Sequence, residues 1–176
     1  MKNASAKNIA HKLFINFVPT AIYDPRHCLQ STVKWARELQ FDPKNIVFEV
    51  TETEWVEDVE HLKEILAYYK SQGFKVALDD IGSGYSTLNM IAKLHPDIIK
   101  IDREIIDGID SSHANQSVFK AIVSLAKELG ITVLAEGIER EEEATYCFSN
   151  GADLVQGYYF GKPSASPTPF VSQKRD

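Results

Sequence analysis

The stretch that decides the fold is KVALDDIGSG, residues 75–84. Its first half is typical of a buried strand, and the adjacent carboxylates Asp79 and Asp80 stand where that strand should end, because aspartate is depleted in strands. At a strand end of an α/β protein, two such acids are well placed to hold a divalent cation. They could equally cap the next helix or solvate a loop. The other strand ends bear on this choice.

Short apolar runs predict five more strands, each separated from the next by a helical pattern. The runs lie at residues 13–18, 46–50, 98–101, 131–135 and 153–157. Apolar residues recur at helical spacing between them, most clearly over residues 54–70 and 118–129. A glycine closes three of the helices, at Gly73, Gly130 and Gly151. The alternation of strands and helices predicts an α/β fold with a parallel sheet.

The length bears on how that sheet is completed. The chain has 176 residues, whereas a closed eight-stranded barrel takes roughly 200–250 residues. Six strands therefore indicate either a (β/α)8 barrel that is two strands short or an open doubly wound sheet. The glycines of residues 82–84 do not extend to GxGxxG, because Thr87 stands at the third glycine position, and a Rossmann nucleotide site is not expected.

Composition excludes several classes of protein. No run of eighteen apolar residues occurs, so we expect no transmembrane segment, and residues 1–12 lack the apolar core of a signal peptide. Cys28 and Cys147 are too few for a disulfide framework and lack metal-site spacing, which favours a cytoplasmic protein. The net charge is −6 and no Lys/Arg cluster occurs, so we expect no DNA partner.

Polar side chains stand at or near the carboxyl end of every predicted strand. They are Asn16, Glu49, Asp79 with Asp80, Lys100, Glu136 and Gln156. Because parallel strands bring these ends to one face, four carboxylates would share a small volume and could not all ionise without cations. Two ions would resolve this, and oxygen ligands favour Mg²⁺ or Mn²⁺. Such a site suits phosphodiester cleavage by in-line attack of water, with Lys100 orienting the water or stabilising phosphate charge.

Each of these residues also has a structural interpretation. Asn16 could bond neighbouring backbone, Glu49 a nearby lysine, and Gln156 the turn at Gly157, while Lys100 could reach solvent and Glu136 could cap a helix. It is much less expected that all six strands end in this way by chance, so we favour the interpretation that these residues form a functional site. None of the five histidines lies near a strand end with a serine or cysteine partner, which argues against a triad or a zinc site. The acidic run at residues 139–143 is interpreted as a solvated helix start.

Five motifs then resemble those of the EAL-domain family, the bacterial cyclic-di-GMP phosphodiesterases. They are EVTE (49–52), DDIGSG (79–84), IKID (99–102), AEGIE (135–139) and QGYYF (156–160) followed by Lys162-Pro163. The resemblance runs from about Phe14 to Pro163, in the family's order. Ile81 and Ser83 replace the family's usual Phe and Thr.

The resemblance implies a fold, a reaction and a set of roles. The fold is a TIM-like (β/α)8 barrel with one reversed strand, and the reaction is hydrolysis of cyclic-di-GMP to linear pGpG with Mg²⁺ or Mn²⁺, inhibited by Ca²⁺. The implied catalytic residues are Lys100, which contacts the attacking water, Glu136, and Glu52, which braces the loop after Asp80. Gln156 and Asp80 would contact substrate. The implied metal ligands are Asn16, Glu49, Asp79, Asp80 and Glu136.

One departure concerns the signature that names the family. In the family, the Glu-Ala-Leu segment supplies a further metal ligand and lies much more than fifteen residues before the position of Asn16. Only fifteen residues precede Asn16 here, and Glu-Ala-Leu does not occur among them. We therefore expect a fragment or truncated member, with a tail at 1–12, a partial domain at 13–163 and a flexible tail at 164–176. Its open flank would favour a homodimer or a partner chain. The alternative to an enzyme is an inactive EAL-like module that acts by binding nucleotide or protein.

Overall fold

The computed structural model describes residues 12–16, 18, 22, 24–51, 59–82 and 87–164. Its strands are β1 (Leu13–Asn16), β2 (Ile46–Val50), β3 (Lys75–Ile81), β4 (Ile98–Ile101), β5 (Thr132–Ala135) and β6 (Leu154–Val155). Its helices are α2 (Pro25–Cys28), α3 (Gln30–Glu38), the 3-10 turn η2 (Pro43–Asn45), α4 (Val59–Ser71), α5 (Thr87–Leu94), α6 (Arg103–Ile106), α7 (His113–Leu129) and α8 (Glu141–Ser149). The six predicted strands are confirmed.

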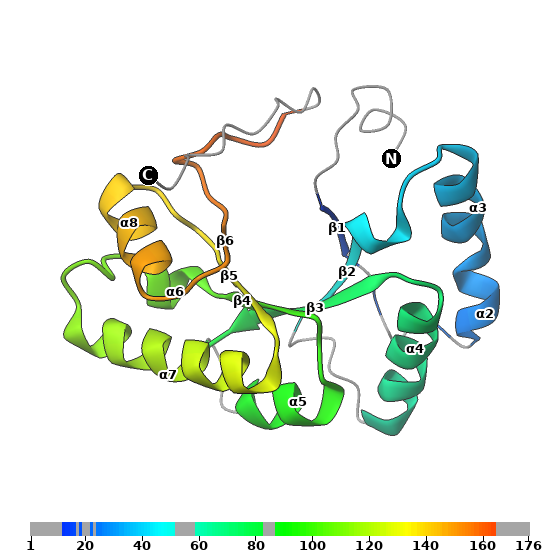
Figure 1. Cartoon of the computed structure of the whole chain (residues 1–176), viewed down its shortest axis with the longest axis horizontal. Helices are drawn as coiled ribbons and strands as arrows, with labels where there is room; N and C mark the ends of the chain where they lie inside the picture. The colour runs from blue at the N-terminus through cyan, green and yellow to red at the C-terminus, as the bar shows by residue number, and fades with distance from the viewer. Residues whose placement is uncertain are drawn as a thin grey trace.

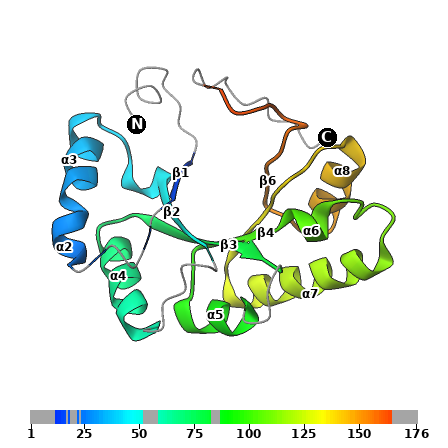
Figure 2. The same cartoon turned by 180° about the vertical axis from the view of Figure 1, so that it is seen from behind.

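The six strands form one parallel sheet in which spatial order follows chain order, from β1 to β6. The sheet curls into an arc, and the helices lie along its outer side, opposite the concave inner side (Figures 1 and 2). A doubly wound sheet would reverse its strand order at one point and carry helices on both faces. That alternative is wrong for this chain, and the half-barrel of TIM type is the observed fold.

The register of the strands offsets them in steps, as tilted barrel strands are. Glu49 of β2 pairs with Ala77 of β3, which in turn pairs with Ile98 of β4. On the next step, Lys100 of β4 pairs with Leu134 of β5. Asn16 and Glu49 therefore share one step, Lys100 stands one step beyond Glu49, and the polar residues do not form one flat ring.

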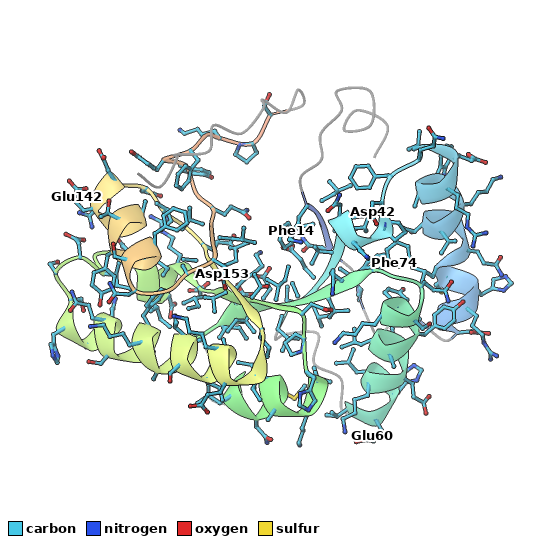
Figure 3. The ribbon with its side chains drawn as sticks, in the orientation of Figure 1. Phe14, Asp42, Glu60, Phe74, Glu142 and Asp153 are labelled. Atoms are coloured by element: carbon cyan, nitrogen blue, oxygen red, sulfur yellow. The ribbon has the colours of Figure 1, made fainter. Side chains whose placement is uncertain are left out.

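Strand residues alternate between two apolar layers. Residues facing outward, such as Phe48, Leu78 and Ile99, join the large core beneath the helices. Residues on the inner side of the sheet form a smaller cluster made of Val47, Ala77, Ile98 and Leu134, with Phe14 and Leu154 packed against it. Phe14 lies on the inner side of β1 (Figure 3). The smaller cluster lies directly beneath the residues of the candidate site.

Helix positions agree with the sequence patterns better than helix faces do. In α7 the buried residues are Phe119, Ile122, Val123 and Ala126, whereas Val118 and Leu129 of the expected apolar stripe are exposed. The expected stripe was out of phase with the true face by about one residue. Gly130 closes α7 in the left-handed region at φ 69°, as its position predicted. The short helix α6, whose N-cap is the Asp102 side chain, was not predicted.

The sequence also led to expectations about the two ends of the chain and about membrane-spanning segments. The tails expected at residues 1–12 and 164–176 lie outside the described residues, apart from Lys12 and Ser164. Among the helices that are described, none has the length and apolar character needed to cross a bilayer.

Candidate active site

The strand-end residues stand on the inner face because side chains alternate along each strand. Glu49, Asp79, Lys100 and Glu136 each follow by two positions a residue of the inner apolar cluster, namely Val47, Ala77, Ile98 and Leu134. The same spacing separates Asn16 from Phe14 and Gln156 from Leu154. One apolar layer therefore carries one polar layer above it, at the carboxyl ends of all six strands.

Lys100 lies at the centre of the polar layer. Its Nζ is 2.9 Å from Glu49 Oε1, 2.9 Å from Asp79 Oδ1 and 2.7 Å from Glu136 Oε2. The stepped register explains this reach, because Lys100 stands one step beyond Glu49 and one step before Glu136. Three carboxylates from three strands thus share one ammonium, and their combined charge exceeds its charge by two.

Burial makes this cluster electrostatically costly. Lys100 and Glu49 are two of only three charged or polar residues that are buried in the described part of the chain, at 3% and 7% exposure. Burial opposes the charged form of Lys100, but hydrogen bonds to Glu136, Asp79 and Glu49 outweigh it and raise the pKa of its ammonium. Burial dominates for Glu49 and raises the pKa of its carboxyl despite the contact with Lys100. The site is therefore poised to accept additional positive charge.

The adjacent acids on β3 are separated by a local irregularity. The β3–β4 register shifts between Leu78 and Ile81, and Asp80 adopts a left-handed backbone at φ 56°. The Asp80 N–H donates to Asp79 Oδ1 at 3.0 Å. Burial, followed by repulsion from Asp79, raises the pKa of Asp80 to about 6. Bulges of this kind redirect side chains at site edges, and here one acid contacts Lys100 while the next lines a groove.

The groove beside the cluster has a volume of about 790 Å³. Asp80, Glu136 and Gln156 line it, together with residues to which the sequence assigned no role: Asp102, Arg103, Glu139, Tyr158 and Lys162. Arg103 NH2 is 2.9 Å from Glu139 Oε1, and Lys162 Nζ stands 5.4 Å from the Tyr158 ring centroid. The groove thus has cationic and aromatic walls beside an acidic centre. The motif stretches quoted above contain all of these residues except Arg103.

The remaining predicted site residues have different outcomes. Asn16 is exposed at the end of β1 and pairs in register with Glu49. Gln156 is also exposed, and its backbone is fixed between Ala135 O at 2.8 Å and Ile138 N at 3.0 Å. Glu52 lies outside the described residues. The structure therefore brings Glu49, Asp79, Lys100 and Glu136 into direct contact, with Asp80 and Gln156 at the rim.

The carboxylates of the site that the structure describes have the chemistry of metal ligands, but they are not arranged around a common metal position. The oxygens of Glu49, Asp79, Asp80 and Glu136 are the type that Mg²⁺ and Mn²⁺ prefer. Within the described ranges, however, no group of three or more His, Cys, Asp and Glu side chains is arranged to hold a metal ion. The three carboxylates converge on the Lys100 ammonium instead. The chemistry of the donors fits a divalent ion, and the geometry is that of three carboxylates gathered around one lysine ammonium.

One protein-family model matches most of the chain. The model of the EAL domain matches residues 1–163. The chain belongs to the EAL domain family.

This EAL chain is similar to proteins named as cyclic di-GMP phosphodiesterases and to solved structures with the nucleotide bound. It is 36% identical over 152 residues to the probable cyclic di-GMP phosphodiesterase PdeG of Escherichia coli, which covers 85% of this chain and 29% of PdeG. A standalone EAL protein of Vibrio cholerae in its cyclic-di-GMP-bound form is 44% identical, with a TM-score of 0.89 over 97% of this chain and 72% of that one. BlrP1 of Klebsiella pneumoniae, in complex with manganese and cyclic-di-GMP, is 33% identical, with a TM-score of 0.82 over 92% of this chain and 42% of that one.

Proposed function

We propose that this EAL domain hydrolyses cyclic-di-GMP to linear pGpG with the help of divalent metal ions. The observation that supports the proposal most is the convergence of Glu49, Asp79 and Glu136 on Lys100, at the carboxyl ends of parallel strands where such folds place their active sites. The adjoining groove gives an anionic nucleotide a place beside that cluster. The relatives named above support the choice of nucleotide.

Binding would divide between the groove and the acidic centre. Arg103 and Lys162 on the groove walls would offset phosphate charge, and the Tyr158 ring offers a face on which a guanine can stack. Gln156 at the rim would contact the nucleotide. The overall charge of −6 makes these local cations necessary, because the protein as a whole repels an anion.

The acidic centre would hold the metal ions through Asn16, Glu49, Asp79, Asp80 and Glu136. A bound divalent ion lowers the pKa of a water molecule and neutralises charge on the phosphate. In the reaction, the oxygen of water would form a bond to phosphorus while the bond from phosphorus to the ribose 3′ oxygen breaks. Lys100 would hold the attacking water by hydrogen bonding and offset charge on the phosphate oxygens.

A second candidate function is a non-catalytic module that binds cyclic-di-GMP. It is favoured by the Lys100 ammonium, which already contacts the three carboxylates that metal ions would need. The chain matches only 29% of the length of PdeG, so an activity like that of a whole phosphodiesterase is a proposal for this chain. The two functions differ in one readout, because only the enzyme forms pGpG.

The assembly of the protein is proposed from the two edges of its sheet. Among the described residues, β1 pairs with β2 alone and β6 with β5 alone, so both edges of the sheet offer unpaired backbone groups. We propose that a second copy or another chain covers this flank, and that the protein works in the cytoplasm. Light scattering of the purified chain tests the first point: a particle of twice the monomer mass or more is expected, and a monomer at all concentrations would contradict it.

The function is tested by incubating the purified chain with cyclic-di-GMP and Mn²⁺ or Mg²⁺, followed by separation of the nucleotides. The wild-type chain should form pGpG, and Glu136→Gln should not, because the variant loses a carboxylate of the central cluster. Glu142→Gln is the matched control, since Glu142 is exposed on α8. Binding of cyclic-di-GMP without any product would favour the second candidate.

A further inference from the structure

Glu143 is the third buried charged residue of the described chain and the only one away from the central cluster. It is the last acid of the run at residues 139–143 and is 1% exposed, so the interpretation of that run as fully solvated is wrong at this position. Glu141 and Glu142, on the same first turn of α8, are exposed as expected. A carboxylate is rarely buried unless its partners are charged or hydrogen-bonded, which directs attention to what Glu143 holds.

Both oxygens of the Glu143 carboxylate accept hydrogen bonds. Oε2 accepts from the Glu139 N–H at 3.0 Å and from the Arg140 N–H at 3.1 Å. Oε1 accepts from the Gly108 N–H at 3.2 Å and from the Arg140 guanidinium at 2.8 Å (NH2) and 3.1 Å (Nε). Arg140 NH2 also donates to Asp110 Oδ1 at 2.7 Å. One buried carboxylate thus joins the loop after α6 to the loop before α8.

The loop before α8 is the segment that carries Glu136. It leaves β5 at Glu136, passes through Gly137 at φ 79° and reaches Glu139, whose N–H Glu143 holds. Between them, the Ile138 N–H donates to Gln156 O at 3.0 Å, and Ile138 O accepts from the Tyr159 N–H at 3.0 Å. Gly157 packs so closely on Ile138 that a Cβ at Gly157 would lie 2.0 Å from Ile138 O. Movement of this loop would therefore shift Glu136, Gln156 and a wall of the groove together.

We propose that Glu143 is a positioning residue for the active site, which fixes the loop of residues 136–140 and through it the placement of Glu136 and Gln156. It belongs neither to the central cluster nor to the residues that line the groove, and it contacts the groove lining through the Glu139 N–H, so it acts through the backbone it holds. The catalytic consequence rests on the proposed function, whereas the rigidity of the loop does not. Misplacement of a reacting group by a fraction of an ångström is enough to slow a reaction.

Glu143→Gln is the sharpest perturbation. The variant keeps the shape of the side chain, but its amide nitrogen must face N–H donors, so one of the two contact sets is lost. Glu142→Gln is the control. Glu142 is exposed and points outward from the first turn of α8 (Figure 3), and its substitution is the same chemical change on the same turn as Glu143. Arg140→Lys is a milder second variant that removes the two-pronged guanidinium contact and leaves the backbone N–H groups in place, in case Glu143→Gln does not fold.

Two measurements are made on these variants. Amide hydrogen exchange should speed up over residues 137–140 by about tenfold in Glu143→Gln, while exchange within α4 stays unchanged. The dissociation constant for Mn²⁺, measured by calorimetry, should rise by about tenfold, as it does when groups that orient metal ligands are lost. Arg140→Lys should show smaller changes of the same sign, and Glu142→Gln should match the wild type.

The outcomes separate the two claims. Unchanged exchange over residues 137–140 in a folded Glu143→Gln variant overturns the positioning role. Faster exchange with wild-type Mn²⁺ affinity also overturns it, because the loop then moves without affecting the site. If the wild-type chain binds no Mn²⁺, the proposed function fails, and the exchange measurement alone still decides whether Glu143 holds the loop.

Discussion

Replacement of Lys100 by methionine removes the one cation at the centre of three carboxylates. Methionine keeps most of the length and apolar body of the side chain, so the change is mainly the loss of the ammonium. Glu49, Asp79 and Glu136 would then face one another without their shared partner. At neutral pH the metal-free variant should be less stable than the wild type, because like charges remain at short distance in a partly buried site.

The size of the effect follows from the exposure of the three acids. The side chains of Glu49 and Asp79 are 9% and 13% exposed, so their contacts with Lys100 are poorly screened by water. The Glu136 side chain is 34% exposed and contributes little. Removing one partner of a buried ion pair costs about 3–5 kcal/mol, and we expect the lower end here. For a domain of this size, a loss of about 3 kcal/mol lowers Tm by roughly 6–12 °C.

The assay is thermal unfolding of the metal-free protein as a function of pH. The loss of stability should be full at pH 7 and should shrink at acid pH, because the Glu49 carboxyl, whose pKa is raised by burial, takes up a proton there and no longer needs a counterion. Lys75→Met is the matched control: Lys75 pairs with Asp97 at 2.7 Å, but its side chain is 40% exposed, so the same substitution should cost at most about 1 kcal/mol.

The result that would refute this reasoning is a Lys100→Met variant as stable as Lys75→Met at pH 7. Equal stability would mean that the three carboxylates are hydrated or protonated in solution and that Lys100 does not hold them together. A loss of stability that persists at low pH would point to lost packing instead of lost charge.

Three further predictions concern the same site. Because the pKa of Asp80 is raised to about 6 from 3.8, its ionisation opposes folding; this part of the stability is present at low pH and is lost as pH rises from about 4 to 6. Asp80→Asn should therefore stabilise the metal-free chain by about 1–2 kcal/mol at pH 7 and not at pH 4, as measured by urea unfolding, after allowance for screening; equal effects at both pH values would contradict it. Asp79→Asn should abolish the rise in Tm on adding Mn²⁺, and a rise equal to that of the wild type would remove Asp79 from the proposed ligand set. Gly157→Ala should cost about 3 kcal/mol, because the new Cβ would meet the backbone of Ile138, whereas Gly108→Ala, with no atom within 4 Å, should cost only about 1 kcal/mol for its left-handed backbone; denaturant midpoints that coincide would show that the β6 turn can yield.

The strands could be predicted because each is a short apolar run with a polar residue at or near its carboxyl end. That pattern reflects burial on both faces, which the sequence records directly at residues 46–50 and 98–101. The gathering of Glu49, Asp79, Lys100 and Glu136 followed from parallel pairing alone. The choice between half-barrel and doubly wound sheet could not be made from the pattern of elements, because it depends on strand order in space.

Other features depended on contacts that no local pattern records. Glu143 resembles its exposed neighbours in sequence, and its burial depends on the nearby N–H groups of Glu139 and Arg140 together with the Gly108 N–H of a distant loop. Arg103 entered the groove through α6, a single turn too short to give a periodic signal. The face of α7 was misjudged because Val118 is as apolar as Phe119, and packing decides which of them is buried.

The most direct test of the central claim is hydrolysis of cyclic-di-GMP by the purified chain in ¹⁸O-labelled water with Mn²⁺, followed by mass analysis of the product. The account predicts pGpG that carries one ¹⁸O in its 5′ phosphate, and no product from Asp79→Asn or Glu136→Gln. Absence of pGpG from the wild-type chain, or equal product from either variant, would contradict the claim that the acids around Lys100 form the catalytic centre.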